Sequence, residues 1–175
     1  EWVGGWGINF NAGKAQAKVE DSKKLHQLIT ATGEYSVEAW VAPNNVVQEG
    51  PARIVSYSAG NTVRNFTLGQ VQGDYRFFHR STTTDANGAP ALTTPNGSNV
   101  VQASLQHVVM TFDGINGRRL YVNGELVTPN DAIAPGNLSE WDNSYAFVLG
   151  SEISKQHAFR GVIRLVAVYN RALTA

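Results

Sequence analysis

Apolar and polar residues alternate with a period of two in several short segments of the chain. In residues 37–41, valine or alanine occupies every second position, and Glu38 and Trp40 lie between them. Successive side chains of a β-strand point to opposite faces of a sheet, so this alternation predicts a strand with one buried face. Pro43 ends the segment because proline cannot donate to the hydrogen-bond ladder of a sheet.

Similar segments recur along the rest of the chain, each bounded by Gly, Asn, Asp or Pro. The further predicted strands cover residues 52–58, 65–71, 75–81, 105–113, 118–122, 125–128, 146–149 and 162–170. Strands that recur about every 8 to 12 residues are typical of a β-sandwich. Asn123-Gly124 supplies the positive φ angles that a two-residue type I′ hairpin turn requires. The pattern predicts an all-β, antiparallel two-sheet fold.

Three segments fall outside this pattern. Residues 19–30 place a few apolar side chains at helical spacing, but threonines and Gly33 follow soon after, so we expect a loop with one helical turn. Residues 82–99 are rich in Thr, Asn, Gly and Pro and predict a long loop, the kind of element that often carries binding residues on a rigid sandwich. Trp2 and Trp6 are expected to pin the first strand against a sheet.

Composition narrows the classes of protein to which the chain belongs. With 175 residues, 42% of them hydrophobic and only 16% charged, it has the size and apolar content for one domain over residues 1–175. Lys plus Arg (14) equals Asp plus Glu (14), so no net charge favours nucleic acid. Cysteine is absent, which excludes disulfides and thiolate metal sites. No apolar run approaches the ~18 residues of a membrane span. We expect a mature or excised piece of a larger protein.

Several short phrases occur in a fixed order and cover nearly the whole chain. Among them are YSVEAWVAP at 35–43, HVVMTFDG at 107–114, RLYVNG at 119–124 and VYNRAL at 168–173. In this order they resemble the concanavalin A-like, laminin-G-like jelly-roll family of bacterial extracellular proteins. The resemblance implies two antiparallel sheets packed face to face, with the final strand beside the strands near the N-terminus. The lack of cysteine near the end departs from the animal laminin-G pattern and disfavours a receptor role.

The resemblance also bears on function and ligands. It implies a module of a larger secreted, periplasmic or cell-surface protein that binds glycans or mediates adhesion. It requires no cofactor but allows a structural calcium ion, for which acidic loop residues are present although no site can be named. The partners it implies are a glycan, an acidic polysaccharide among them, or a protein, together with the other domains of the parent chain; nucleic acid and membrane insertion are not expected.

A catalytic site is not expected. A retaining glycanase needs two carboxylates about 5 Å apart, and no predicted strand carries such a pair on one face. Tyr75, His79 and Arg80 come nearest to the residues of a lyase, but such a set arises easily by chance. We expect His107 to be a hydrogen-bonded structural residue and Trp40 to be a structural residue covered by a loop. A polysaccharide-degrading enzyme is therefore the least favoured function.

The predicted ligand surface lies on the two neighbouring strands at 65–71 and 75–81. If their apolar residues face the core, the outward set comprises Asn65, Arg76, Phe78 and Arg80, with Trp141 on a loop at the rim. Aromatic rings stack on sugars, amides bind hydroxyls, and guanidinium groups pair with carboxylates or sulfates. We predict a non-catalytic carbohydrate-binding or adhesion module. The alternative is a structural or protein-interaction domain of a multidomain periplasmic or surface protein.

Overall fold

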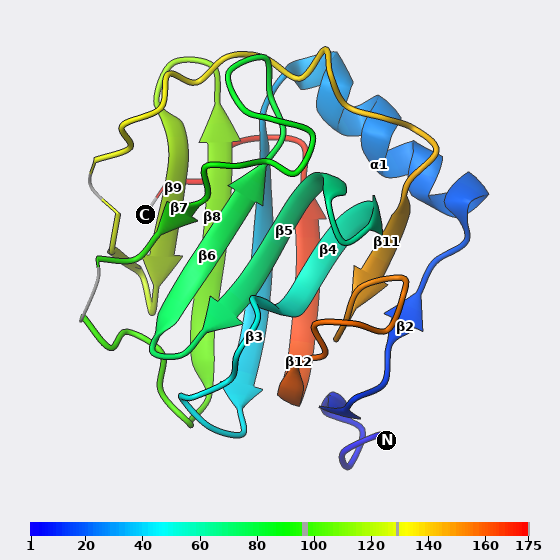
Figure 1. The fold of residues 1–175 in the computed structure, drawn as a ribbon, viewed down its shortest axis with the longest axis vertical. Helices are drawn as coiled ribbons and strands as arrows, with labels where there is room; N and C mark the ends of the chain where they lie inside the picture. The colour runs from blue at the N-terminus through cyan, green and yellow to red at the C-terminus, as the bar shows by residue number, and fades with distance from the viewer. Residues whose placement is uncertain (96–97, 129, 175) are drawn as a thin grey trace.

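The computed structural model describes residues 1–95, 98–128 and 130–174 and consists of two six-stranded antiparallel sheets packed face to face (Figure 1). The β3 sheet has the order β1-β12-β3-β8-β9-β10, and the β5 sheet has the order β2-β11-β4-β5-β6-β7. The elements are β1 (Ile8–Asn11), β2 (Ala15–Gln16), α1 (Val19–Thr32), β3 (Tyr35–Pro43), β4 (Ala52–Gly60), β5 (Val63–Val71), β6 (Asp74–His79), β7 (Leu92–Thr93), β8 (Gln106–Asp113), β9 (Gly117–Val122), β10 (Glu125–Leu126), β11 (Ala146–Leu149) and β12 (Arg160–Tyr169). The predicted all-β jelly-roll sandwich is confirmed, and β12 returns between β1 and β3.

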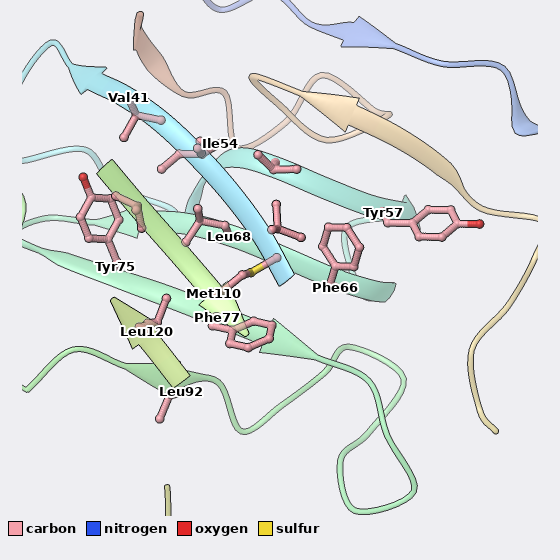
Figure 2. Close-up of a cluster of buried hydrophobic side chains, with 14 of the residues drawn as sticks. Val41, Ile54, Tyr57, Phe66, Leu68, Tyr75, Phe77, Leu92, Met110 and Leu120 are labelled. Carbon is pink, nitrogen blue, oxygen red and sulfur yellow. The ribbon is translucent and has the colours of Figure 1, made fainter. Parts of the chain in front are cut away.

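The core lies between the sheets and is filled by the alternate residues that the sequence pattern assigned to it. Val37, Ala39 and Val41 of β3 are fully buried, as are Phe66 and Leu68 of β5. Figure 2 shows side chains from both sheets meeting in this layer, with Met110 of β8 among them. Burial of this apolar surface is the main stabilising term of the sandwich.

The turn between β9 and β10 forms as predicted. Asn123 and Gly124 have φ angles of 52° and 87°, and they join the directly paired residues Val122 and Glu125. These values fit a type I′ turn. The segment predicted as a long loop, residues 82–99, also contains β7, which pairs with β6; residues 96–97 lie outside the described part of the chain.

The prediction of a loop with one helical turn at residues 19–30 is wrong, because α1 is a helix of 14 residues. Tertiary packing overrides the weak helical propensity, since Ile29 is buried in the core and the carbonyl of Ser22 accepts a hydrogen bond of 3.0 Å from the Tyr57 hydroxyl. Gly33 does not shorten the helix but caps it. Its φ of 75° is left-handed, and its N–H donates to the Ile29 carbonyl.

Trp2 and Trp6 do not pin the first strand, and that expectation is wrong. Their side chains are 75% and 74% exposed. The backbone makes the contact instead: at Gly7, whose φ is 148°, an added Cβ would lie only 2.7 Å from the Ile163 carbonyl oxygen of β12. The close approach of two backbones leaves no room between them for an indole ring.

Candidate functional site

The outer face of the β5 sheet does not present the predicted ligand surface. Asn65 is fully buried, and Phe78 and Trp141 are only 8% and 6% exposed. The expectation that these three side chains are open to a ligand is therefore wrong. Arg76 on β6 and Arg80, directly after the end of β6, remain half-buried. The structure thus keeps two of the five predicted residues near the surface and places the other three under loops or in the core.

A cluster of buried charges explains why Phe78 is covered. The guanidinium carbons of Arg53 and Arg64 lie 5.5 and 5.2 Å from the centre of the Phe78 ring. Glu152, from the loop between β11 and β12, lies 3.4 Å from Arg53 Nε and 3.8 Å from Arg64 Nη1. Burial lowers the pKa of Arg53 to about 10, and the neighbouring Arg64 charge adds to this effect. Both arginines and Glu152 are buried, so this loop is bound tightly over β4 and β5.

Asn65 and Trp141 hold a second loop in place. The Asn65 amide donates to the Asp142 carbonyl (2.8 Å) and accepts from the Asp142 N–H (2.9 Å). The Trp141 ring packs 5.1 Å from the Tyr35 ring in the core, and its indole N–H donates to the Arg80 carbonyl (2.8 Å). Arg80 itself donates to the Tyr145 hydroxyl (3.2 Å). The amide and indole groups therefore fix the chain rather than a ligand.

The residues that came nearest to a lyase site are also structural. The Tyr75 hydroxyl donates to Gln106 Oε1 (2.9 Å), and His79 Nδ1 lies 2.8 Å from the Tyr35 hydroxyl. Tyr75 and His79 are 0% and 1% exposed. A substrate cannot reach either group in this structure.

The outer face of the β3 sheet, by contrast, exposes aromatic and apolar side chains. Trp40 on β3 is 38% exposed, so the expectation that a loop covers it is wrong. Its ring lies 4.9 Å from that of His107, its directly paired neighbour on β8, at an interplanar angle of 32°. Leu165 on β12 pairs with Trp40 from the other side and is also exposed. The indole is thus held in place by two neighbouring strands while one part of it remains open to solvent.

Glu38 connects the three central strands of this face. Its Oε1 lies 2.9 Å from His107 Nε2, and its Oε2 accepts a hydrogen bond of 2.7 Å from the Tyr169 hydroxyl of β12. The hydrogen bond from Tyr169 lowers the pKa of Glu38 against the opposing effect of burial, and His107 lowers it further. The carboxylate is therefore ionised at neutral pH. His107 is hydrogen-bonded as expected, although its ring also reaches the surface.

A hollow of about 240 Å³ lies beside the Trp40–His107 pair. We call it the Glu38 hollow; it is lined by Glu38, His107, Val109, Tyr121, Gly124, Leu173 and Thr174. Most of its surface is apolar, and the Tyr121 ring lines it in addition to the His107 ring.

The C-terminal segment closes one end of the hollow. After β12 the chain turns back across the outer face of the β3 sheet (Figure 1). The hydroxyl of Ser36 donates to the Arg171 carbonyl and accepts from the Leu173 N–H, both at 2.8 Å. On its far side lies a second hollow of about 520 Å³, which shares Leu173 and Thr174 with the first. We call this the Asp113 hollow.

The groups in and beside the Glu38 hollow can stack on a ligand and form hydrogen bonds with it. Tyr121 and the ionised Glu38 carboxylate line the hollow, and the partly exposed Trp40 indole lies beside it, outside the lining. Among the described residues that line it, Glu38 is the one carboxylate, so the pair that a retaining glycanase needs is missing there. The described part of the chain contains no group of three or more His, Cys, Asp or Glu side chains placed to hold a metal ion.

The sequence contains a signal that this face carries outward-pointing Glu38 and Trp40. The same alternation that buries Val37 and Val41 directs Glu38 and Trp40 outward, and His107 lies on a strand of matching pattern. The missing information was which sheet the loops cover. No local pattern shows that the loop of Glu152 packs on Arg64 of the β5 sheet, 88 residues earlier in the chain.

Known proteins share the fold. A model of the concanavalin A-like lectin/glucanases superfamily, Laminin_G_3, matches residues 11–175. No curated protein sequence matches the chain. Among the described residues, no helix has the length and apolar character to cross a membrane.

Similar solved structures include the CBM40 of the Ruminococcus gnavus IT-sialidase bound to α2,3-sialyllactose (TM-score 0.70, 19% identity, 96% of this chain and 91% of that chain). Trypanosoma rangeli sialidase also matches (TM-score 0.57, 18% identity, 96% and 26%), as does a botulinum neurotoxin type C structure that concerns two ganglioside molecules (TM-score 0.57, 12% identity, 86% and 35%). The chain spans only about a quarter to a third of these last two proteins. At such identities the likeness concerns the fold. With the family model covering nearly its full length, the chain belongs to the concanavalin A-like lectin/glucanases superfamily.

Proposed function

We propose that this domain is a non-catalytic carbohydrate-binding module, carried by a larger secreted, periplasmic or cell-surface protein, and that a sugar ring stacks on Trp40 at the edge of the Glu38 hollow. The observation that carries the proposal is the Trp40 indole, 38% exposed and packed beside the His107 ring of the neighbouring strand, with 4.9 Å between the ring centres. An indole fixed in this way binds the apolar face of a pyranose without a large cost in side-chain entropy.

Two further observations support sugar as the ligand. Tyr121 lines the hollow together with Glu38 and adds an aromatic face and a hydroxyl group that a sugar can contact. In addition, the similar CBM40 structure contains α2,3-sialyllactose and matches over 91% of its own length, as a binding module separate from a catalytic domain would.

Protein interaction is the second candidate function. Leu165 and Leu126 are 44% and 40% exposed on the same sheet face as Trp40, and exposed apolar patches often mark protein interfaces. A similar solved structure, the binding domain of botulinum neurotoxin DC, is in complex with rat synaptotagmin II. This alternative predicts that the apolar side chains, not the polar groups of the hollow, dominate binding.

The test is a glycan array followed by titration calorimetry with the best glycan, for the unmodified domain and for Trp40→Ala and Trp40→Phe. We expect Trp40→Ala to weaken binding by at least about tenfold, which corresponds to about 1.4 kcal/mol. Trp40→Phe keeps an aromatic face and should restore most of the affinity. Both variants must retain the thermal midpoint of the unmodified domain to within a few degrees. Unchanged glycan affinity in a folded Trp40→Ala variant would show that the sugar binds elsewhere or that the domain binds another class of ligand.

A further inference from the structure

The charges around the Glu38 hollow constrain which sugars it can accept. Among its described lining residues, Glu38 is the one acidic group, and no lysine or arginine lines it. One oxygen of Glu38 interacts with His107 and the other with Tyr169. The imidazole and the Tyr169 hydroxyl therefore already have the carboxylate as their hydrogen-bond partner. A carboxylate or sulfate in the hollow would therefore meet the negative charge of Glu38 without a lysine or arginine among the described lining residues to pair with it.

The neighbouring Asp113 hollow strengthens the same bias. Its described lining includes two acidic residues, Glu34 and Asp113, and one basic residue, Arg119. Arg119 donates to Asn116 Oδ1 at 2.9 Å, and Glu34 accepts from the Ala172 N–H at 2.9 Å. A glycan that extends past the C-terminal segment would thus pass from one site of negative charge to another.

We infer that the Glu38 hollow selects sugars that carry no anionic group, whether neutral or amine-bearing, and excludes uronic, sialic and sulfated sugars. This inference rests on the proposed sugar-binding function and names the ligand class of the same site. It also separates this domain from the CBM40 that it resembles in fold, whose structure contains an acidic sugar. The expectation of an acidic polysaccharide rested on Arg76 of β6 and on Arg80 directly after it, and β6 belongs to the opposite sheet.

The partial burial of Glu38 makes the repulsion strong enough to measure. The Glu38 side chain is 21% exposed, so water screens its charge only in part. Two like charges a few ångströms apart repel by about 1 kcal/mol in bulk water and by several times more near a protein surface. We therefore expect at least about a tenfold preference for the uncharged member of a matched glycan pair.

The experiment measures affinity ratios on matched oligosaccharides: lactose against α2,3-sialyllactose, and xylohexaose against its glucuronate-substituted form. Glu38→Gln keeps the size of the side chain and removes the charge, and it should reduce the preference for the uncharged member by at least about fivefold. The ratio is the readout, because a purely structural role of Glu38 would weaken both members alike. Glu125→Gln is the control, since it removes an exposed carboxylate on β10 that does not line the hollow. It should leave the ratio unchanged.

The outcomes separate the two proposals. If Trp40→Ala weakens binding but the unmodified domain binds the acidic member equally or better, the selectivity inference is overturned while the sugar-binding function stands. An unchanged ratio in Glu38→Gln overturns the role of Glu38. If Trp40→Ala leaves every affinity unchanged, the proposed binding site is itself wrong.

Discussion

His79 is a core histidine whose protonation is incompatible with the native packing. Its ring lies 4.0 Å from the Phe112 ring, and Nδ1 lies 2.8 Å from the Tyr35 hydroxyl. Its Nε2 atom is buried without a hydrogen-bond partner in the described part of the structure. Burial lowers the pKa of His79 well below its ordinary value of 6.5, and the positive charge of Arg118 lowers it further. Acidification should therefore destabilise the fold through this residue.

The magnitude follows from proton linkage. As pH falls through about 6.5, His79 in the unfolded chain gains a proton while the native imidazole stays neutral. The stabilisation is therefore fully present above the pKa that His79 has in the unfolded chain, and it is lost as pH falls toward the lower pKa of His79 in the native protein. Each pH unit well below 6.5 costs about 1.4 kcal/mol, and the loss between pH 7 and pH 5 is about 2 kcal/mol. For a chain of this size, the thermal midpoint should fall by roughly 4 to 8 °C.

Urea unfolding at pH 7 and pH 5, followed by tryptophan fluorescence, measures this loss. The test variant is His79→Asn, whose amide oxygen accepts from the Tyr35 hydroxyl but takes up no proton. We expect it to be less stable at both pH values because its side chain is smaller, yet to lose most of the pH difference. His157→Asn is the comparison variant. Burial and Arg53 also lower the pKa of His157, but its side chain is only partly buried, so this change should remove less of the pH difference than His79→Asn does. The reasoning is refuted if His79→Asn keeps the full pH difference.

Two further predictions concern the residues that fix loops to the β5 sheet. Glu152→Gln should lower the free energy of unfolding by about 3 to 5 kcal/mol, since it leaves Arg53 and Arg64 buried without a carboxylate. The control is the same change at the exposed Glu140, which should lower the free energy of urea unfolding by less than about 1 kcal/mol. Trp141→Phe should cost about 1 to 3 kcal/mol, because the Arg80 carbonyl loses its donor, and should leave glycan affinity in calorimetry unchanged; a selective loss of binding at full stability would restore Trp141 as a ligand residue.

The strands were predictable because their information is local. Alternation along β3 and β5 and the Asn123-Gly124 turn each lie within a few residues, so the sequence determines them without knowledge of the rest of the chain. Helix α1 was missed because its stability comes from Ile29 and other residues packing on a core assembled from distant strands. The Thr30 hydroxyl donates to the His26 carbonyl four residues earlier, so its polar group is satisfied inside the helix.

Three of the five residues predicted to bind a ligand are buried, and the reason is physical. Polar residues that face outward on a strand have two uses in a sandwich: they bind solvent and ligands, or they anchor a loop that crosses the sheet. Asn65 anchors a loop, since its amide satisfies the backbone of Asp142, 77 residues away. Hydrogen-bonding capacity is the same in both uses, so residue type alone does not distinguish them.

Exposure of an aromatic ring does distinguish the two uses. A loop that covers a sheet buries the rings beneath it, as happens to Phe78, because the apolar area removed from water stabilises the covered state. Trp40 stays partly exposed near the centre of β3, so the C-terminal segment that crosses this face leaves the indole uncovered. Leaving that indole in water forgoes stabilisation that covering it would provide. The exposed indole is thus the physical reason to propose the ligand site on the β3 face rather than on the better hydrogen-bonded β5 face.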